Sequence, residues 1–165
     1  MLRRLAVLAV SAVAAAVPAT ASADAPQRYD IDIVVSDTLD CSQFDPAWTF
    51  NDDFTDFYTG SGQVWVDDAG NPVRAIEHIY HRSNDVNSVT GFTLHEHNHI
   101  TLVYDYAADT VSLSGAINIM QRPGVGEVIH ISGHKILDLE TGEPLVIHGP
   151  DTQGGDEDFC AAVAP

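Results

Sequence analysis

The chain has 165 residues, 45% of them hydrophobic, and its 24 acidic side chains against seven lysines and arginines give a formal net charge of −17 at pH 7. Nucleic acids and anionic lipids both require a basic patch, so this composition argues against either as a partner. The length suits one ordinary domain with a core of its own.

The first 23 residues have the features of a secretory signal peptide. Two arginines precede an apolar stretch that ends at Val17, and residues 21–23 (Ala-Ser-Ala) supply the small side chains that signal peptidase recognises. The apolar stretch is shorter than the roughly 20 residues that span a bilayer. We therefore predict an N-terminal signal helix over residues 1–23 and a secreted domain over residues 24–165, with no membrane attachment after cleavage. That domain carries a charge of about −19, from five basic and 24 acidic residues.

The two cysteines, Cys41 and Cys160, lie near the two ends of the predicted domain. In an oxidising compartment an even pair of this kind is most simply a structural disulfide. The spacing has no C-x-x-C motif of the kind that redox or metal-binding thiols use. We therefore expect Cys41 and Cys160 to be bonded to each other.

Short segments with strand character follow the leader, separated by turn-forming sequences. In chain order they are residues 29–35, 63–66, 73–80, 92–95, 100–106, 111–120, 128–137 and 145–148. An aromatic-rich stretch over residues 44–58 is expected to fill the core or one end of the fold, and a ligand pocket lined by the same rings is the alternative. About eight strands at this spacing predict an all-β fold, an antiparallel, roughly eight-stranded barrel of calycin-like type.

The clearest single strand covers residues 111–119. Its apolar positions alternate with small or polar ones, and they are Val111, Leu113, Gly115, Ile117 and Ile119. A period of two with one apolar face is typical of a half-buried strand. The pattern predicts that Asn118 lies on the opposite face, and the glycine within the apolar row predicts a bend or a bulge at that point.

Several motifs of the second half carry a family resemblance. They are Val89-Thr90-Gly91, Leu113-Ser114-Gly115, Pro123-Gly124-Val125-Gly126, Gly133, Asp138-Leu139-Glu140-Thr141-Gly142, His148-Gly149-Pro150-Asp151 and Phe159-Cys160. With them, the region from Gly60 to Cys160 resembles a group of small secreted actinobacterial proteins of unassigned function. The rhythm of strands and turns is more loosely similar to the eight-stranded barrels of allene oxide cyclases and dirigent proteins. The resemblance implies a barrel with a cavity, and it carries over no active site because those families' catalytic residues do not match this sequence.

The histidines are the feature with the most chemical promise. The chain has eight of them, and the sequence His-Glu-His-Asn-His occupies residues 95–99. On a strand, His95, His97 and His99 share one face, and imidazoles at that spacing can chelate a transition metal such as Zn, Cu or Ni. A further ligand could come from other strands, where the candidates are Glu77, His78, His81, His130 and His134.

The parity of this segment complicates the metal hypothesis. An unbroken strand would turn the three histidines to solvent and Glu96 and Asn98 to the core, which is costly for a charge without a partner. The sequence therefore predicts a bend or turn near residues 96–98. Three interpretations of the histidines stay open: a metal site, a solvated or pH-sensitive patch, and hydrogen-bonding roles in the core or a pocket.

The sequence as a whole predicts a secreted barrel that binds a small, mostly apolar ligand. The alternatives are an isomerase or cyclase that works through a polar group in an apolar cavity, and an extracellular metal-binding protein that uses the histidine cluster. The chain has no G-x-S-x-G elbow, Walker loop, G-x-G-x-x-G or H-E-x-x-H motif. Whether it is an enzyme is therefore left open, and no catalytic residue is assigned.

Overall fold

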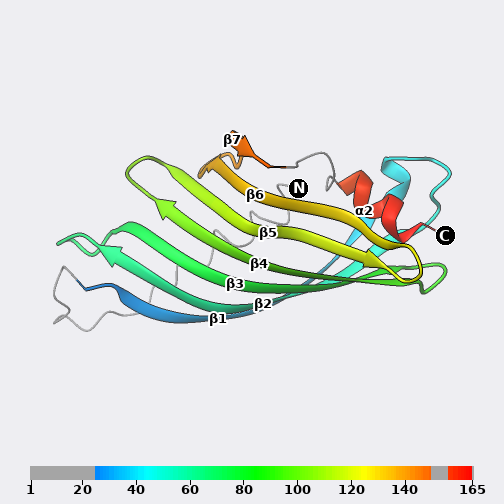
Figure 1. Ribbon diagram of the computed structural model, residues 1–165, viewed down its shortest axis with the longest axis horizontal. Coiled ribbons are helices and arrows are strands. Elements are labelled where there is room, and N and C mark those ends of the chain that lie inside the picture. Colours follow the sequence, from blue (N-terminus) through cyan, green and yellow to red (C-terminus); the bar gives the residue numbers. More distant parts are fainter. Residues whose placement is uncertain (1–24, 150–155, 165) are drawn as a thin grey trace.

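A computed structural model describes residues 25–149 and 156–164, and most of this chain is antiparallel sheet (Figure 1). The strands are β1 (Gln27–Asp40), β2 (Asn51–Val66), β3 (Pro72–Asn87), β4 (Thr93–Asp105), β5 (Thr110–Arg122), β6 (Gly126–Asp138) and β7 (Pro144–His148). A short 3-10 helix, η2 (Cys41–Gln43), follows β1, and α2 (Asp156–Val163) lies near the C-terminus. The predicted signal peptide lies outside the described residues.

The strands form one sheet in the order β1-β2-β3-β4-β5-β6-β7, and each is antiparallel to the next. The all-β class is confirmed, but the described strands number seven and the sheet is open, in place of the expected closed barrel of about eight strands. Closure requires the first and last strands to pair along their lengths, and β7 has five residues against 14 in β1. The count differs because the segments predicted at 92–95 and 100–106 are one strand, β4.

The aromatic-rich stretch over residues 44–58 divides between two structures. Its first part is the loop before β2, and the part from Asn51 onward belongs to β2 itself. Only residues 63–66 of β2 were predicted from the sequence. The first part of this strand is rich in acidic and turn-forming residues, which are uncommon in strands, and it has few β-branched residues. Phe50 and Tyr58 are buried in the core, as expected for this stretch, whereas Phe54 is buried outside that cluster and lines a hollow described below.

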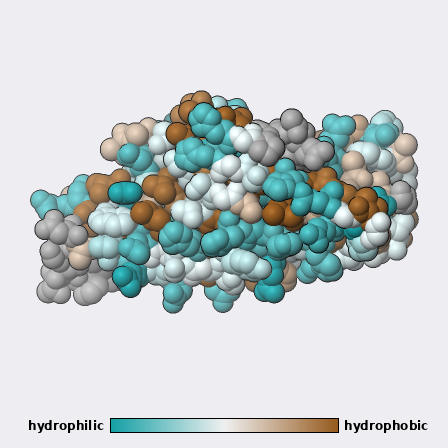
Figure 2. Space-filling view, viewed as in Figure 1, coloured by the Kyte–Doolittle hydropathy of each residue, from teal (hydrophilic) through white to brown (hydrophobic). Residues whose placement is uncertain are grey.

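The two faces of the sheet differ in burial. We call the side of β4 that carries Leu94, Ile100 and Leu102 the inner face, and the side that carries His95 and His97 the outer face; the first three side chains are buried and the two histidines are exposed. Helix α2 packs on one end of the inner face, where its apolar side chains join the core (Figure 1). In the same view, hydrophilic residues predominate along the lower side of the molecule, over the region of β1 and β2 (Figure 2).

A row of glycines crosses the sheet where it bends. Gly60 on β2, Gly115 on β5 and Gly133 on β6 lie in one transverse row of the strand register. A Cβ at Gly60 would lie 2.0 Å from the carbonyl oxygen of His78, so no other residue fits without movement of the backbone. The bend or bulge predicted at Gly115 is confirmed, because the β5–β6 register shifts just after it.

The predicted disulfide is confirmed. Cys41 and Cys160 are bonded across a sequence separation of 119 residues, which ties η2 to α2. The bond therefore fixes the helix over its end of the inner face. Within residues 25–149 and 156–164, no helix is long and apolar enough to cross a membrane.

Candidate functional site

The bend predicted near residues 96–98 does not interrupt β4, although the register of β4 against β5 shifts between Glu96 and His99. The alternation of faces continues through it and creates a buried polar site. Strand β4 runs unbroken from Thr93 to Asp105, so Glu96 and Asn98 turn to the inner face and are only 4% and 2% exposed. The register places Glu96 opposite Ser83 and Asn98 opposite His81 on β3. A buried charge requires a partner, and tertiary structure supplies one that the local sequence does not reveal.

His81 is that partner, and it lies between two carboxylates. Its Nε2 is 3.2 Å from Asp56 Oδ1, and its Nδ1 is 3.4 Å from Glu96 Oε1. Asn98 Nδ2 lies 2.9 Å from the same Nδ1 and donates to Glu96 Oε1 at 2.5 Å. The ring stacks on Tyr58 with centroids 4.4 Å apart, and the Tyr58 hydroxyl donates to Asp56 Oδ2 at 3.2 Å.

The protonation of His81 follows from these contacts. Burial lowers the pKa of the imidazole, but the hydrogen bonds and charges of Asp56 and Glu96 outweigh it and raise the pKa to about 9. The ring is therefore cationic at neutral pH. Each ring nitrogen faces a carboxylate, so His81 serves as the counter-ion of two buried acids.

Two buried acceptors, one on β4 and one on β5, are not satisfied by the described residues. Glu96 Oε2 and Asn118 Oδ1 are buried, and neither has a hydrogen-bond partner within the part of the chain that the structure describes. They lie on neighbouring strands, because Glu96 pairs with Met120 and Asn118 stands two residues before it on β5. A buried acceptor without a donor costs about 1–3 kcal/mol, so these two oxygens are the polar atoms of this region whose hydrogen bonds the described residues leave open.

Asn118 was predicted on the opposite face, and this prediction is wrong. The register of β5 against β6 shifts between Ala116 and Asn118. A β-bulge inserts one residue and reverses the alternation beyond it. Asn118 therefore points inward at 8% exposure, although the strand alternates as predicted up to Leu113 and Gly115.

A second polar cluster lies farther along the inner face. The hydroxyls of Tyr29 and Tyr104 donate to the two oxygens of Glu77, at 2.6 Å and 3.1 Å. Tyr29 reaches across β2 because position 62 is glycine, where a Cβ would lie 2.2 Å from the tyrosine ring. Burial, together with the Glu77 carboxylate, raises the pKa of both tyrosines. Both Glu77 oxygens thus accept a hydrogen bond, and the cluster links side chains of β1, β3 and β4.

The histidines of the predicted metal site lie on the outer face. His95, His97 and His99 are exposed on alternate positions of β4, and His95 Nδ1 lies 2.7 Å from Asn84 Oδ1. The register puts the further candidates His78, His130 and His134 on the same face, whereas Glu77 and His81 lie on the other. Among the described residues no three side chains of His, Cys, Asp or Glu are grouped to hold a metal, and the metal site stays a prediction.

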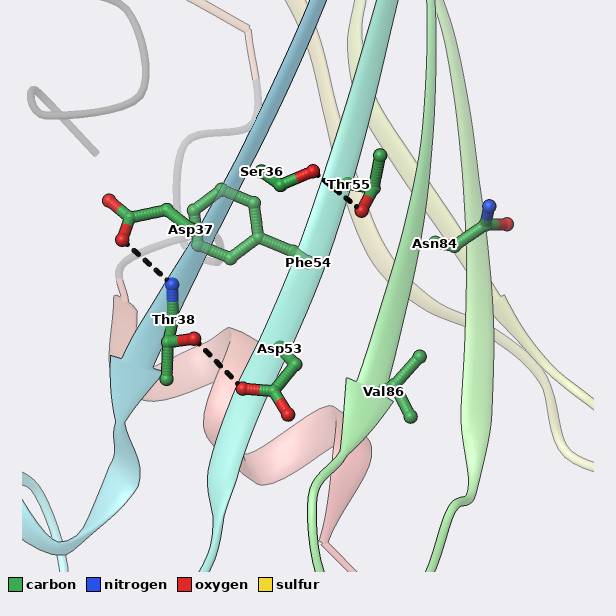
Figure 3. A pocket seen from close by; sticks show the side chains of 8 residues that line it. All are labelled: Ser36, Asp37, Thr38, Asp53, Phe54, Thr55, Asn84 and Val86. Atoms are coloured by element: carbon green, nitrogen blue, oxygen red, sulfur yellow. Dashed lines mark hydrogen bonds between the residues drawn. The ribbon is translucent and has the colours of Figure 1, made fainter.

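A hollow of about 590 Å³ lies where β1, β2 and β3 meet (Figure 3). Its polar side chains bond to one another: Ser36 Oγ lies 3.0 Å from Thr55 Oγ1, and Thr38 Oγ1 donates to Asp53 Oδ1 at 2.9 Å. The remaining lining residues are Asp37, Phe54, Asn84 and Val86. Because these hydroxyls are already hydrogen-bonded, they are less available to a ligand than Glu96 Oε2 and Asn118 Oδ1, which have no partner among the described residues.

The chain matches no protein-family model, no curated protein and no solved structure. The resemblance to secreted actinobacterial proteins and to calycin-like barrels therefore stays a prediction.

Proposed function

We propose that this protein is exported and binds a small, mostly apolar molecule on the inner face of its sheet, through a hydrogen-bond donor that reaches Glu96 and Asn118. The observation that supports this is the pair of buried acceptors, Glu96 Oε2 and Asn118 Oδ1, without donors among the described residues. A ligand that supplies the donor removes the desolvation cost of both oxygens.

The surroundings of the two acceptors favour an apolar ligand body. Buried apolar side chains of β4, β5 and β6 share the inner face with them, and they are Leu94, Ile117, Met120, Ile129 and Ile131. Ligand sites are typically apolar with a few convergent polar groups that fix orientation. The carboxylate of Glu96 and the chain's net charge of −17 favour a cationic or neutral donor over an anion. A primary amine or an alcohol on a hydrocarbon body fits this description.

Export is supported by the leader and by the disulfide. The N-terminal sequence has the pattern of a cleaved signal peptide, and Cys41–Cys160 is of the kind that persists in oxidising compartments. The proposed place of action is therefore outside the cell. N-terminal sequencing of the protein recovered from the medium tests this, with Asp24 as the expected first residue.

The ligand class is tested with three probes of equal chain length: n-octylamine, 1-octanol and octanoate. Calorimetric titration should show the amine bound most tightly, the alcohol less and the carboxylate not at all. Glu96→Gln keeps the shape of the side chain and should weaken the amine about tenfold or more, since a hydrogen bond to a charged group contributes roughly 1.5–3 kcal/mol. Glu127→Gln, at an exposed carboxylate on the outer face, is the matched control. Equal amine affinity in Glu96→Gln and the parent would contradict the proposal.

Catalysis by the same site is a second candidate, because Glu96 Oε2 is a buried carboxylate oxygen without a hydrogen-bond donor among the described residues. In an isomerase or cyclase of the cavity type, Glu96 would act as the base and His81 would hold the second oxygen in place. Recovery of the bound molecule separates the candidates. A binding protein returns it unchanged, whereas an enzyme converts it in the parent chain and not in Glu96→Gln.

An extracellular metal-binding role is the third candidate, and the common outer-face position of His95, His97 and His99 favours it. Protein secreted without an affinity tag and dialysed against a weak chelator should then keep close to one Zn, Cu or Ni ion per chain. His95→Ala should lose that ion. A metal-free parent chain would remove this candidate and leave the inner-face proposal unaffected.

A further inference from the structure

We infer that two copies of this chain associate through the free edge of β1, in an antiparallel register centred on Val34. The sheet ends in very different strands, since β1 has 14 residues and β7 has five. Every residue of β1 pairs with β2 without a register shift, and no other described strand pairs with it. A long, regular edge presents a row of backbone donors and acceptors that a second strand can use.

The sequence of β1 is complementary to itself about Val34. In a two-fold pair, residues equally distant from Val34 face one another. Val34 then meets Val34, Asp32 meets Ser36, Asp30 meets Thr38, and Arg28 meets Asp40. The outer-face row thus has apolar contact at its centre and opposite charges at both ends. Each pair involves one residue from either copy, so every contact occurs twice except the central one.

Neighbouring registers are less favourable. A pair centred on Asp32 puts that carboxylate opposite itself, and one centred on Ile31 puts Asp30 opposite Asp32. Like charges directly opposite each other are destabilising in an antiparallel pair. A pair centred on Ile33 keeps apolar contacts on the inner face but puts Val34 opposite Asp32 on the outer face. Of these four registers, the one centred on Val34 avoids facing carboxylates and has apolar contacts on both faces, so it is the one that we propose.

The exposure of Val34 supports the same register. Its side chain is 60% exposed, and it lies beside Phe57 on β2, whose ring is covered by Arg82 at 5.9 Å. Pairing would bring two such apolar groups together across the outer face. On the inner face, the half-buried Ile33 of each copy would meet Val35 of the other, which extends the apolar contact to both sides.

Asp37 limits the strength of this association. Its Oδ1 already accepts the backbone N–H of Thr38 at 2.8 Å, a bond that pairing must replace, and in the same register it faces Ile31. The interface of two edge strands is also small, and the net charge of −17 on each chain opposes association. We therefore expect a reversible dimer in the micromolar range that strengthens as salt screens the charges.

The test is sedimentation equilibrium of the exported protein across a concentration series, at low and at moderate salt. The parent should shift from monomer to dimer as concentration rises. Val34→Asp places two carboxylates against each other at the two-fold axis and should weaken the dimer at least about tenfold, because like-charge contacts at interfaces cost several kcal/mol. Val89→Asp, at a 69% exposed valine in the turn before β4, is the matched control and should leave the dimer unchanged.

A second variant moves the equilibrium in the opposite direction. Asp37→Val gives Ile31 of the other copy an apolar neighbour and frees the Thr38 amide, so it should tighten the dimer. Circular dichroism and urea unfolding verify that each variant is folded. A parent chain that stays monomeric at all concentrations and salts, or a dimer that neither β1 substitution shifts, would overturn the inference. Octylamine binding is measured independently and does not depend on this result.

Discussion

Residues 95–99 of β4 alternate between an exposed outer face and a buried inner face, and the two faces carry different polar side chains. On the outer face, His95, His97 and His99 are exposed, whereas Glu96 and Asn98 between them are buried on the inner face. The same division holds across the sheet, because the register and burial put seven of the eight histidines on the outer face and leave His81 alone inside, between Asp56 and Glu96. The histidines outside are exposed or half-buried, while the one inside neutralises buried acids.

The largest effect should come from releasing the helix that covers the inner face. Replacing Cys41 and Cys160 together by alanine removes a link across 119 residues and should cost about 5 kcal/mol of unfolding free energy by the chain-entropy estimate. Urea unfolding measures the loss, and amide exchange should rise first in α2. If α2 stayed as protected as in the parent, the bond would not be what holds the helix on the sheet.

A matched pair of histidine substitutions tests the difference between the faces directly. His81→Leu removes the cation between two buried carboxylates and should cost about 3–5 kcal/mol. His97→Leu, on the neighbouring strand but on the outer face, should change stability by no more than about 0.5 kcal/mol. Chemical unfolding of the two variants measures both values. Equal losses would mean that the inner cluster contributes no more than an exposed side chain.

The pH dependence of stability should report the same cluster. The pKa of His81 is about 9 in the folded chain against 6.5 for a free side chain. The stability that it contributes is therefore fully present below pH 6.5 and is lost as pH rises through about 9, a decline of roughly 3 kcal/mol. Urea unfolding over this range measures it. His81→Gln should lack this decline, and a variant that kept the parent's slope would assign the titration to another group.

The smallest of these effects should come from the row of glycines that bends the sheet toward its inner face. Gly60→Ala brings a methyl group against the His78 carbonyl oxygen, where a Cβ would lie 2.0 Å away. Relief of that contact requires the strands to move apart, at a cost of about 1–3 kcal/mol. Ser61→Ala, at the next and exposed position, should be close to neutral. Similar unfolding midpoints for the two variants would show that the bend tolerates a side chain.

The sequence by itself determined the elements whose cause is local. Period-two alternation predicted β5 as far as Gly115, the turn-forming residues separated most strands, and the only two cysteines left one possible pairing. Each of these predictions needed only a segment of a few residues or the number of cysteines in the chain. The same signals predicted the all-β class, because strand alternation and turns are properties of the chain itself.

Only the tertiary structure decided where the buried charges lie and how the sheet ends. Glu96 is stable inside because His81 arrives from β3 as its counter-ion, with Asp56 of β2 on the other side of the same ring. No pattern within β4 shows that partner. The bulge after Ala116 turned Asn118 inward, since one inserted residue reverses every face beyond it. Closure of the sheet into a barrel would require β1 and β7 to pair along their lengths, and β7 is too short for this. These two strands are far apart in the chain, so no local sequence pattern predicts whether they pair.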